Sequence, residues 1–158
     1  MDNSLRASAR ERASVRLASA PDLQRLLPHV REFWKFEQLS WDTVDVAAVL
    51  GNLLADPRLG CVFVVELEQE LVGYLVLTFG YSIEHGGRDA LVDELYLRPD
   101  LRGAGVGARL IDSAAAACRA QGVRRLHLEV DDTNLRASQL YGRLGFARNQ
   151  RFLMTMKL

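Results

Sequence analysis

A short run of glycines between two well-patterned segments constrains this chain more than any other feature. Gly103, Gly105 and Gly107 lie between a strand-like run over 90–97 and a helix-like run over 108–121. Glycines at the start of a helix expose successive backbone N–H groups, and these groups carry the positive end of the helix dipole. The pattern therefore predicts a phosphate- or pyrophosphate-binding loop where a strand passes into a helix.

Two well-known phosphate loops fit this stretch poorly. A Walker loop needs Lys-Ser or Lys-Thr after its last glycine, whereas Ala-Arg follows here. A dinucleotide-binding fingerprint matches Gly103, Gly105 and Ala108, with Glu129 as a candidate ribose ligand at the end of the next strand. That fingerprint follows its strand directly and opens a long series of strand–helix units. Residues 98–101 intervene here and little more than one such unit follows, so this second fold is not expected.

A third type of loop matches the surrounding residues. The segment 93–107, with an Arg-x-x-Gly-x-Gly core that begins at Arg102, resembles the coenzyme A signature of the GCN5-related N-acetyltransferase (GNAT) superfamily. A second segment, Asn134-x-x-Ala137-x-x-x-Tyr141 followed by Gly-Phe at 145–146, resembles the final strand–helix element of that family. The two motifs stand in the family's order, one helix and one strand apart. The resemblance covers residues 71–158 clearly and the rest in outline.

Composition is typical of one compact enzyme domain. The chain has 158 residues, of which 49% are hydrophobic and 25% charged, which predicts a single domain over 13–158. The resemblance implies that this is an N-acetyltransferase domain. Residues 1–12 are polar and aperiodic, which predicts a disordered tail. Twenty basic residues balance twenty acidic ones, so neither nucleic acid nor a membrane is expected as a partner.

Cysteine usage and the lack of targeting segments favour a cytoplasmic protein. Cys61 and Cys118 are too few for a disulfide framework, and neither has a metal ligand at CxxC or HxxxC spacing. We therefore predict no metal, and we expect His127, between two leucines, to be structural or at the surface. No apolar run approaches the roughly 20 residues that span a bilayer, and no signal peptide is apparent at the N-terminus.

Hydrophobic periodicity predicts an antiparallel first half, followed by alternating helices and strands. Strands are expected over 14–18, 61–67, 71–79, 90–97, 126–130 and 152–158. Helices are expected over 21–34, 42–55, 108–121 and 134–145. This order predicts an α+β fold of α/β layers. The resemblance implies a GNAT-like mixed, mostly antiparallel central sheet flanked by helices, with a V-shaped splay between the fourth and fifth strands.

The resemblance also implies that acetyl-CoA binds as cosubstrate in the V-shaped opening. There the N–H groups of the glycine loop bind the pyrophosphate, Arg102 adds positive charge, and unpaired backbone groups of the preceding strand bind the pantetheine arm. Asn134 binds the same arm, and Arg143 either contacts a CoA phosphate or is only solvated. The implied cofactor-binding residues are Leu95, Tyr96, Leu97, Arg102, Gly103, Ala104, Gly105, Val106, Gly107, Ala108, Asn134, Ala137 and Arg143.

The implied chemistry is attack of an amine on a thioester, with Tyr141 as the general acid for the leaving thiolate. An amine with a pKa of about 10.4 must first lose a proton, so a base or a chain of waters is needed. Asp93 and Glu94 are the candidate bases. Adjacent strand residues point to opposite faces, so only one is expected to face the acceptor. Comparison with the family's polyamine acetyltransferases slightly favours Asp93, and the alternative for both is a sheet residue paired with an arginine.

The sequence thus predicts an acetyl-CoA-dependent N-acetyltransferase that acts by direct attack in a ternary complex. The acceptor is a primary amine, either small and polyamine-like or part of a peptide. Candidates for acceptor contact are Phe33, Trp34, Phe36, Trp41 and His85. The alternative is a non-catalytic acyl-CoA-binding sensor or interaction module, and the resemblance is compatible with a homodimer.

Overall fold

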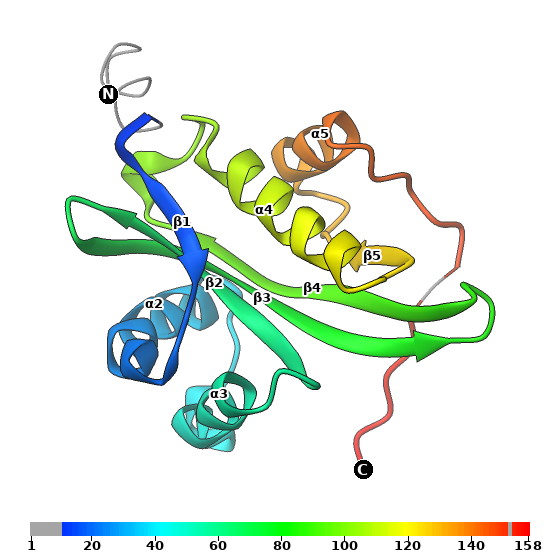
Figure 1. Cartoon of the computed structure of the whole chain (residues 1–158), viewed down its shortest axis with the longest axis horizontal. Coiled ribbons are helices and arrows are strands. Elements are labelled where there is room, and N and C mark those ends of the chain that lie inside the picture. The colour runs from blue at the N-terminus through cyan, green and yellow to red at the C-terminus, as the bar shows by residue number, and fades with distance from the viewer. Residues whose placement is uncertain (1–10, 152) are drawn as a thin grey trace.

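One five-stranded sheet forms the centre of the computed structural model, which describes residues 11–151 and 153–158 (Figure 1). The strands are β1 (Ser14–Leu17), β2 (Gly60–Leu67), β3 (Glu70–Ser82), β4 (Gly87–Leu97) and β5 (Arg125–Leu128). They lie in the order β1-β2-β3-β4-β5, antiparallel up to β4 and parallel between β4 and β5. The mixed, mostly antiparallel sheet expected from the sequence is confirmed.

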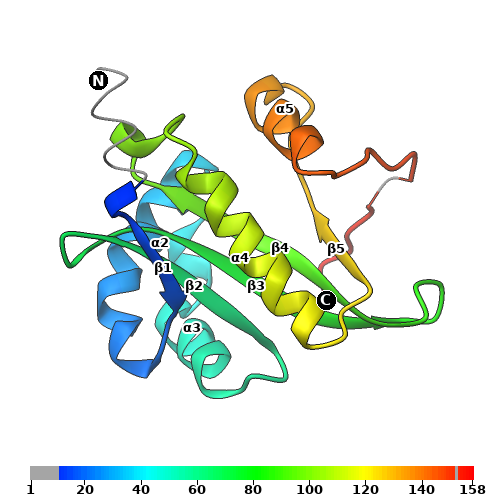
Figure 2. The same ribbon diagram turned by 45° about the horizontal axis from the view of Figure 1, so that its top comes forward.

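Helices cover both faces of this sheet. The α-helices are α2 (Leu23–Phe36), α3 (Val46–Ala55), α4 (Val106–Ala120) and α5 (Leu135–Arg143), and the short 3-10 helices are η1 (Ala20–Asp22), η2 (Trp41–Thr43) and η3 (Pro99–Leu101). Figures 1 and 2 show α2 and α3 on one side of the sheet and α4 and α5 on the other. The fold is the layered α+β arrangement that the sequence predicts. No helix among the described residues is long and apolar enough to cross a membrane.

Each face of the sheet has its own apolar core, because strand side chains alternate between the faces. On β2, Phe63 and Val65 belong to the core beneath α4, whereas Val62 and Val64 belong to the core against α2 and α3. The α4 core is completed by Leu110, Ile111, Ala114 and Cys118, and the opposite core by Leu26, Val30, Val46 and Leu50. The sheet is therefore packed on both faces, and this packing holds the end of β4, after which the glycine loop follows.

A β-bulge interrupts the alternation of β4 at Asp93. Val76 of β3 is paired with Glu94 and the next residue, Leu77, with Val92, so Asp93 is left without a partner. A bulge inserts one extra residue and changes the face on which the following side chains lie. Before the bulge Val92 packs into the α4 core, and after it the even-numbered Tyr96 packs into the core against α2 and α3.

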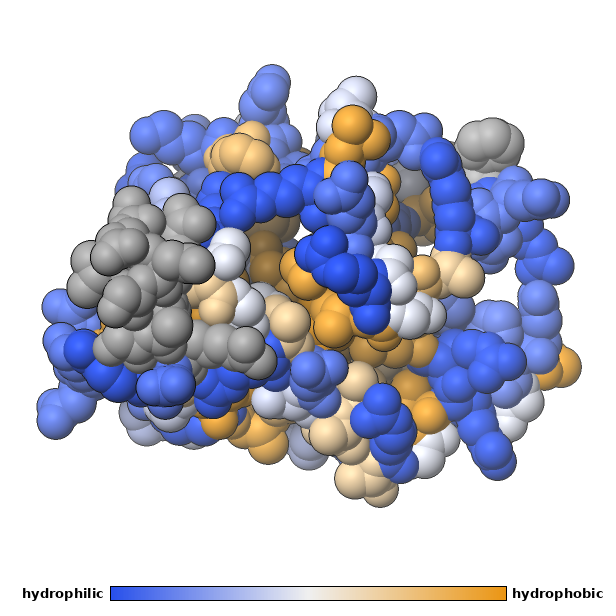
Figure 3. Space-filling view, turned by 90° about the horizontal axis from the view of Figure 1, so that it is seen from above, coloured by the Kyte–Doolittle hydropathy of each residue, from blue (hydrophilic) through white to orange (hydrophobic). Residues whose placement is uncertain are grey.

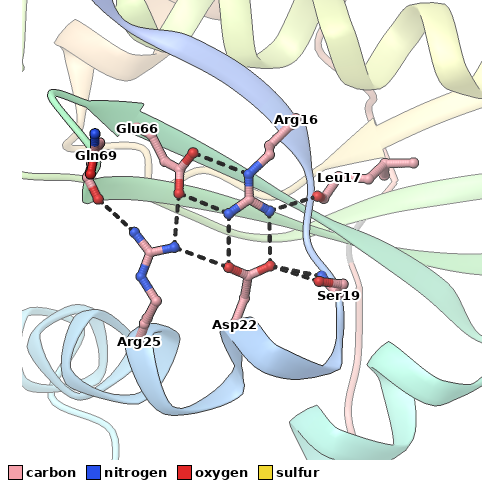
Figure 4. Close-up of polar contacts among 7 residues, drawn as sticks. All are labelled: Arg16, Leu17, Ser19, Asp22, Arg25, Glu66 and Gln69. Atoms are coloured by element: carbon pink, nitrogen blue, oxygen red, sulfur yellow. Dashed lines mark hydrogen bonds and ion pairs between the residues drawn. The ribbon is translucent and has the colours of Figure 1, made fainter.

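An ion-pair network ties β1, α2 and β2 together at one end of the sheet (Figure 4). The Asp22 carboxylate accepts hydrogen bonds from both Nη atoms of Arg16 at 2.8 Å and from Arg25 at 3.2 Å. Glu66 accepts from the same two guanidinium groups. Asp22 also accepts from the backbone N–H and hydroxyl of Ser19, so its buried charge is fully compensated.

The final strand expected over 152–158 is wrong for the residues that the structure describes. Residues 153–158 pair with no strand, and Leu153 and Met154 are 75% and 90% exposed. The segment alternates apolar and polar residues, but it forms no ladder with any strand of the described residues. An ion pair of 2.7 Å from Arg151 to Glu84 holds its start against the β3–β4 turn. Phe152 lies outside the described residues.

The predicted disordered tail over 1–12 falls mostly outside the described residues. Only Glu11 and Arg12 of this segment are described, and Arg12 forms an ion pair with Glu68.

Candidate active site

The glycine loop leads into the uncapped start of α4. Gly103 and Gly105 both have a φ of 83°, in the left-handed region that glycine adopts without strain. Gly105 is the N-cap residue of α4, no side chain caps this end, and no acidic residue lies in the first turn. The first backbone N–H groups of a helix have no partner within the helix, and they carry its positive dipole end. The geometry therefore suits an anion such as a pyrophosphate.

Close packing brings this helix start against the end of β4. A Cβ atom on Gly107 would lie 3.3 Å from Leu97 Cδ1, tighter than most contacts between side chains. Arg102 folds back over the same strand, where its Nε donates a hydrogen bond of 3.0 Å to the Leu97 carbonyl. Its guanidinium group lies 5.5 Å from the Phe36 ring centre and 5.9 Å from that of Tyr96. Arg102 thus joins the loop, β4 and the end of α2.

The second half of β4 has an open edge beside the loop. β4 pairs with β5 only from Asp89 to Val92, while β3 continues beside β4 as far as Leu97. Past Val92 the two parallel strands diverge, which is the splay expected between the fourth and fifth strands. Among the described residues no strand pairs with this edge at 93–97, so backbone groups that point to it are open to a ligand. The Leu97 carbonyl is already used by Arg102.

Glu94 lies on the α2 side of the sheet and is held by two donors. Its carboxylate accepts a hydrogen bond of 2.6 Å from the Trp34 indole and one of 2.7 Å from the Tyr74 hydroxyl. Burial raises the pKa of Glu94, and these two hydrogen bonds partly offset the rise because they favour the charged form. A carboxylate with a raised pKa and fixed orientation is suited to accept a proton.

Asp93, the other candidate base, lies at the bulge. Its side chain is exposed, and partial desolvation raises the pKa of Asp93. Its negative charge also contributes to the raised pKa values of Glu94 and Tyr74, so the two carboxylates influence each other directly. The expectation that one carboxylate faces away assumed regular alternation, and the bulge removes that assumption.

Tyr141 lies on α5, on the other side of the sheet. It is half-buried against Phe146, with ring centres 5.9 Å apart. Burial raises the pKa of Tyr141, and the nearby charge of Glu37 raises it further, so the hydroxyl keeps its proton. At the start of the same helix, Asn134 accepts a hydrogen bond of 3.1 Å from the Ala137 N–H.

The structure gathers these residues into two groups. Arg102, Tyr96, Leu97 and the glycine loop are in contact at the end of β4. Trp34, Tyr74, Asp93 and Glu94 form a second group on the α2 face. Tyr141 contacts neither carboxylate among the described residues, and Arg143 is an exposed side chain in the last turn of α5. The end of α2 lies near both the loop and α5, because Phe36 faces Arg102 and the charge of Glu37 raises the pKa of Tyr141.

Surface hollows lie on both sides of the sheet. The face that carries α4 and α5 shows hydrophobic side chains on the floor of a hollow, with hydrophilic side chains around it (Figure 3). On the α2 side, a pocket of about 390 Å³ is lined by Arg31, Glu32, Trp34, Lys35, Leu39 and Trp41. Trp34 belongs to this pocket and also binds Glu94, so it connects the pocket with the carboxylates.

Tyr74 is the residue of the candidate site that sequence reasoning missed. It stands in an apolar strand run that predicts only a core residue, and its side chain is fully buried. Its hydroxyl reaches Glu94 only because the bulge at Asp93 turns Glu94 onto the same face. The sequence contains no local signal for that bulge.

A family model and similar proteins both relate this chain to acetyltransferases. Residues 26–146 match the family model described as "Acetyltransferase (GNAT) family". The thialysine N-epsilon-acetyltransferase of Bos taurus is 32% identical over 143 residues, which cover 83% of this chain and 82% of that protein. Three uncharacterized N-acetyltransferases from Mycobacterium strains are each 31% identical over 103 residues, which cover 65% of this chain and 62% of those proteins.

Solved structures show the same fold. An integron cassette protein from the mobile metagenome of Cole Harbour Salt Marsh superposes with a TM-score of 0.80 at 33% identity, covering 91% of this chain and 90% of that one. A putative acetyltransferase from Arthrobacter sp. FB24 superposes with a TM-score of 0.78 at 24% identity, covering 92% of this chain and 96% of that one.

Proposed function

Because this chain belongs to the acetyltransferase (GNAT) family and is an N-acetyltransferase, we propose that it moves the acetyl group of acetyl-CoA to a small primary amine. Transfer takes place by direct attack in a ternary complex. The observation that carries this proposal is the meeting of an uncapped helix start with an open strand edge at Leu97. A pyrophosphate at the helix start leaves the adjoining pantetheine arm beside the backbone of Leu95 and Tyr96.

Tyr141 on α5 and the two carboxylates of β4 supply the proton transfers. The amine nitrogen attacks the thioester carbonyl carbon, the carbon–sulfur bond breaks, and the sulfur leaves as a thiolate. Tyr141, which keeps its proton because burial raises its pKa, donates that proton to the thiolate. Glu94, with Asp93 beside it, takes the proton of the amine either directly or through water.

The charges of the α2 side favour a small cationic amine as acceptor. Glu94 and Asp93 together present negative charge next to Trp34, and Trp34 also lines the pocket on α2. An ammonium group is attracted to carboxylates and to the faces of aromatic rings. The similarity to thialysine N-epsilon-acetyltransferases supports an acceptor with a terminal amine on a short chain. A peptide amine is the second acceptor class to be tested.

Two further proposals concern the context of the protein. Residues 13–158 act as one N-acetyltransferase domain, alone or as a homodimer. The two free thiols, half-buried at Cys61 and buried at Cys118, support a cytoplasmic location, where thiols stay reduced.

Thermal unfolding with added nucleotides tests the cosubstrate site. Acetyl-CoA and CoA at 100 times their dissociation constants should each raise Tm by roughly 5–10 °C, because selective binding stabilises the folded state. NADH and ATP should leave Tm unchanged. No rise with acetyl-CoA or CoA would refute the assignment of the loop. Release of CoA thiol with thialysine, polyamines and lysine peptides then identifies the acceptor, and binding without turnover on any amine would favour the sensor alternative.

A matched pair of glycine variants separates the loop's role in binding from its role in folding. Gly105 and Gly122 lie just before and just after α4, with φ values of 83° and 72°. Alanine at either position meets the same left-handed strain of about 1–2 kcal/mol. Gly105→Ala and Gly122→Ala should lower Tm similarly, but only Gly105→Ala should weaken the binding of acetyl-CoA. Equal binding by both variants would contradict the proposed pyrophosphate site.

A further inference from the structure

Three side chains of metal-binding type meet at the end of β4 that lies away from the glycine loop. His85 comes from the β3–β4 turn, Asp89 from the start of β4, and His127 from β5. Each offers one ligand atom, and these atoms all lie within 4.8 Å of one another. Nε2 of His127 is 3.8 Å from Oδ2 of Asp89, and the two imidazole ring centres are 5.1 Å apart. Figures 1 and 2 show this end of the β3–β4 hairpin beside β5.

The Asp89 carboxylate is placed by the backbone around it. Gly80 is its direct partner on β3, and a Cβ atom on Gly80 would lie 2.4 Å from Asp89 Oδ1. The carboxylate therefore occupies space that only a glycine leaves open. On the other side, the parallel pairing of β4 with β5 brings His127 next to Leu91, two residues along the strand from Asp89.

Asp89 has no cationic partner among the described residues. Its side chain is 20% exposed, and the only ion pair it could form there is with His127. The arginines around it have other contacts. Arg125, its partner on β5, donates a hydrogen bond of 3.0 Å to the Arg124 carbonyl, and Arg88 lies over the Phe79 ring at 4.4 Å. Arg151 is bound to Glu84 at 2.7 Å. A partly buried carboxylate without a cation is unfavourable, and a bound cation would compensate its charge.

We propose that His85, Asp89 and His127 bind a divalent transition-metal ion of the Zn²⁺ class. Two imidazoles and one carboxylate are typical ligands of Zn²⁺, and three protein ligands leave a fourth position for water. Ligand bonds of about 2.0–2.2 Å put tetrahedral ligand atoms about 3.4 Å apart. The 3.8 Å between His127 Nε2 and Asp89 Oδ2 is near that spacing, and all three ligand atoms lie within 4.8 Å of one another, so side-chain rotations bring them to it. The ion joins the turn, β4 and β5 where the two parallel strands are still paired.

The sequence prediction of no metal rested on the spacing of the two cysteines. Short-range spacing of this kind could not indicate the proposed ligands, because α4 separates the β3–β4 turn from β5 along the chain. His85, a candidate for acceptor contact from the sequence, lies here with Asp89 and His127. The proposal is independent of the acetyl-transfer chemistry, since none of the three is among the residues that the structure groups around the glycine loop and Glu94.

Titration of untagged protein with Co²⁺ tests the site. Co²⁺ gives visible absorption bands when it replaces Zn²⁺ in four- or five-coordinate protein sites, so we expect bands that saturate at one Co²⁺ per chain. Zn²⁺ should abolish these bands by competition and should raise Tm, since the three ligands come together only in the folded chain. Absence of bands at millimolar Co²⁺, or of any rise in Tm with Zn²⁺, would overturn the proposal.

Variants assign the bands to the three ligands. Loss of a group that only orients a metal ligand weakens metal binding by about 10–100-fold. His127→Ala and Asp89→Asn remove ligands themselves, so each should weaken Co²⁺ binding by at least this factor. The double variant His85→Ala/His127→Ala should bind no Co²⁺. All three residues are partly exposed, so circular dichroism should show a retained fold. His29→Asn, which changes the chain's third histidine on α2, is the matched control and should keep the bands. Bands that survive in the double variant would refute the assignment.

Discussion

Replacement of Asp22 by asparagine tests whether the network in Figure 4 holds β1 and α2 to the sheet. Asp22 is 4% exposed and accepts five hydrogen bonds, three from arginines and two from Ser19. Asparagine keeps the size of the side chain but removes its charge, and its NH₂ group faces guanidinium groups that need acceptors. The change therefore isolates the electrostatic part of the contact.

The size of the effect follows from the exposure of the partners. Removing one member of a buried ion pair costs about 3–5 kcal/mol, because the remaining charge is left uncompensated. The side chains of Arg16 and Arg25 are 38% and 40% exposed, and Glu66 still binds both of them. Water and Glu66 thus compensate part of the loss, and we expect the low end, about 3 kcal/mol. For a chain of this length that is roughly 6–12 °C in Tm.

The pH dependence gives the sign of the contribution. The Arg16 guanidinium holds the pKa of Asp22 well below its ordinary value, so the carboxylate is more acidic in the folded than in the unfolded chain. Such a group stabilises the fold above its unfolded pKa, about 3.9, and this stabilisation is lost as pH falls below it. The stability difference between the native protein and Asp22→Asn should be constant from about pH 5 to 8 and should shrink in acid.

Urea unfolding at several pH values measures this difference. Asp100→Asn is the matched control, because Asp100 also pairs with an arginine, Arg98, but is 45% exposed, so its loss should change stability little. A difference for Asp22→Asn below about 1 kcal/mol, as for a surface ion pair, would refute the reasoning. So would a difference that grows as the pH falls.

Three predictions concern the candidate active site. Tyr141→Phe should lower kcat by about 10²-fold or more without changing acetyl-CoA affinity, and single-turnover and binding assays together measure this. Glu94→Gln should lower kcat and remove the acidic limb of the pH–rate profile. In the native protein that limb should lie above the ordinary glutamate range, because burial raises the pKa of Glu94. Tyr74→Phe removes a hydrogen bond that favours the charged form of Glu94, so it should raise this pKa and move the limb to higher pH. An unchanged limb in Tyr74→Phe would show that Glu94 is not the titrating base.

The predictable parts of this molecule are those in which the residue type follows from local backbone geometry. The left-handed turns at Gly103 and Gly105 admit few other residues, and the start of α4 follows within two residues of its expected position. Helix and strand periodicity likewise predicts the layers, because each element buries one face. These features need no knowledge of distant residues.

The parts that sequence reasoning missed depend on register between distant strands. The contact of Tyr74 with Glu94 depends on one extra residue in β4, and the meeting of His85 with His127 depends on the β4–β5 pairing. The closing segment is predicted as a strand because its apolar and polar residues alternate. Alternation does not indicate which strand a segment pairs with, and residues 153–158 pair with no strand. The roles of Asp93, Glu94 and Tyr141 stay predictions, since they require a bound substrate.

The bulge at Asp93 shifts the register of β4 against β3 by one residue. Strand side chains alternate between the two faces of a sheet. One added residue therefore exchanges the faces for every later side chain, as far as Leu97. Deleting Asp93 would therefore move Glu94 and Tyr96 to the α4 face and turn Leu95 and Leu97 toward α2. The two halves of β4 thus have opposite alternations of side chains. The first suits the half that pairs with β5, and the second suits the half at the candidate active site.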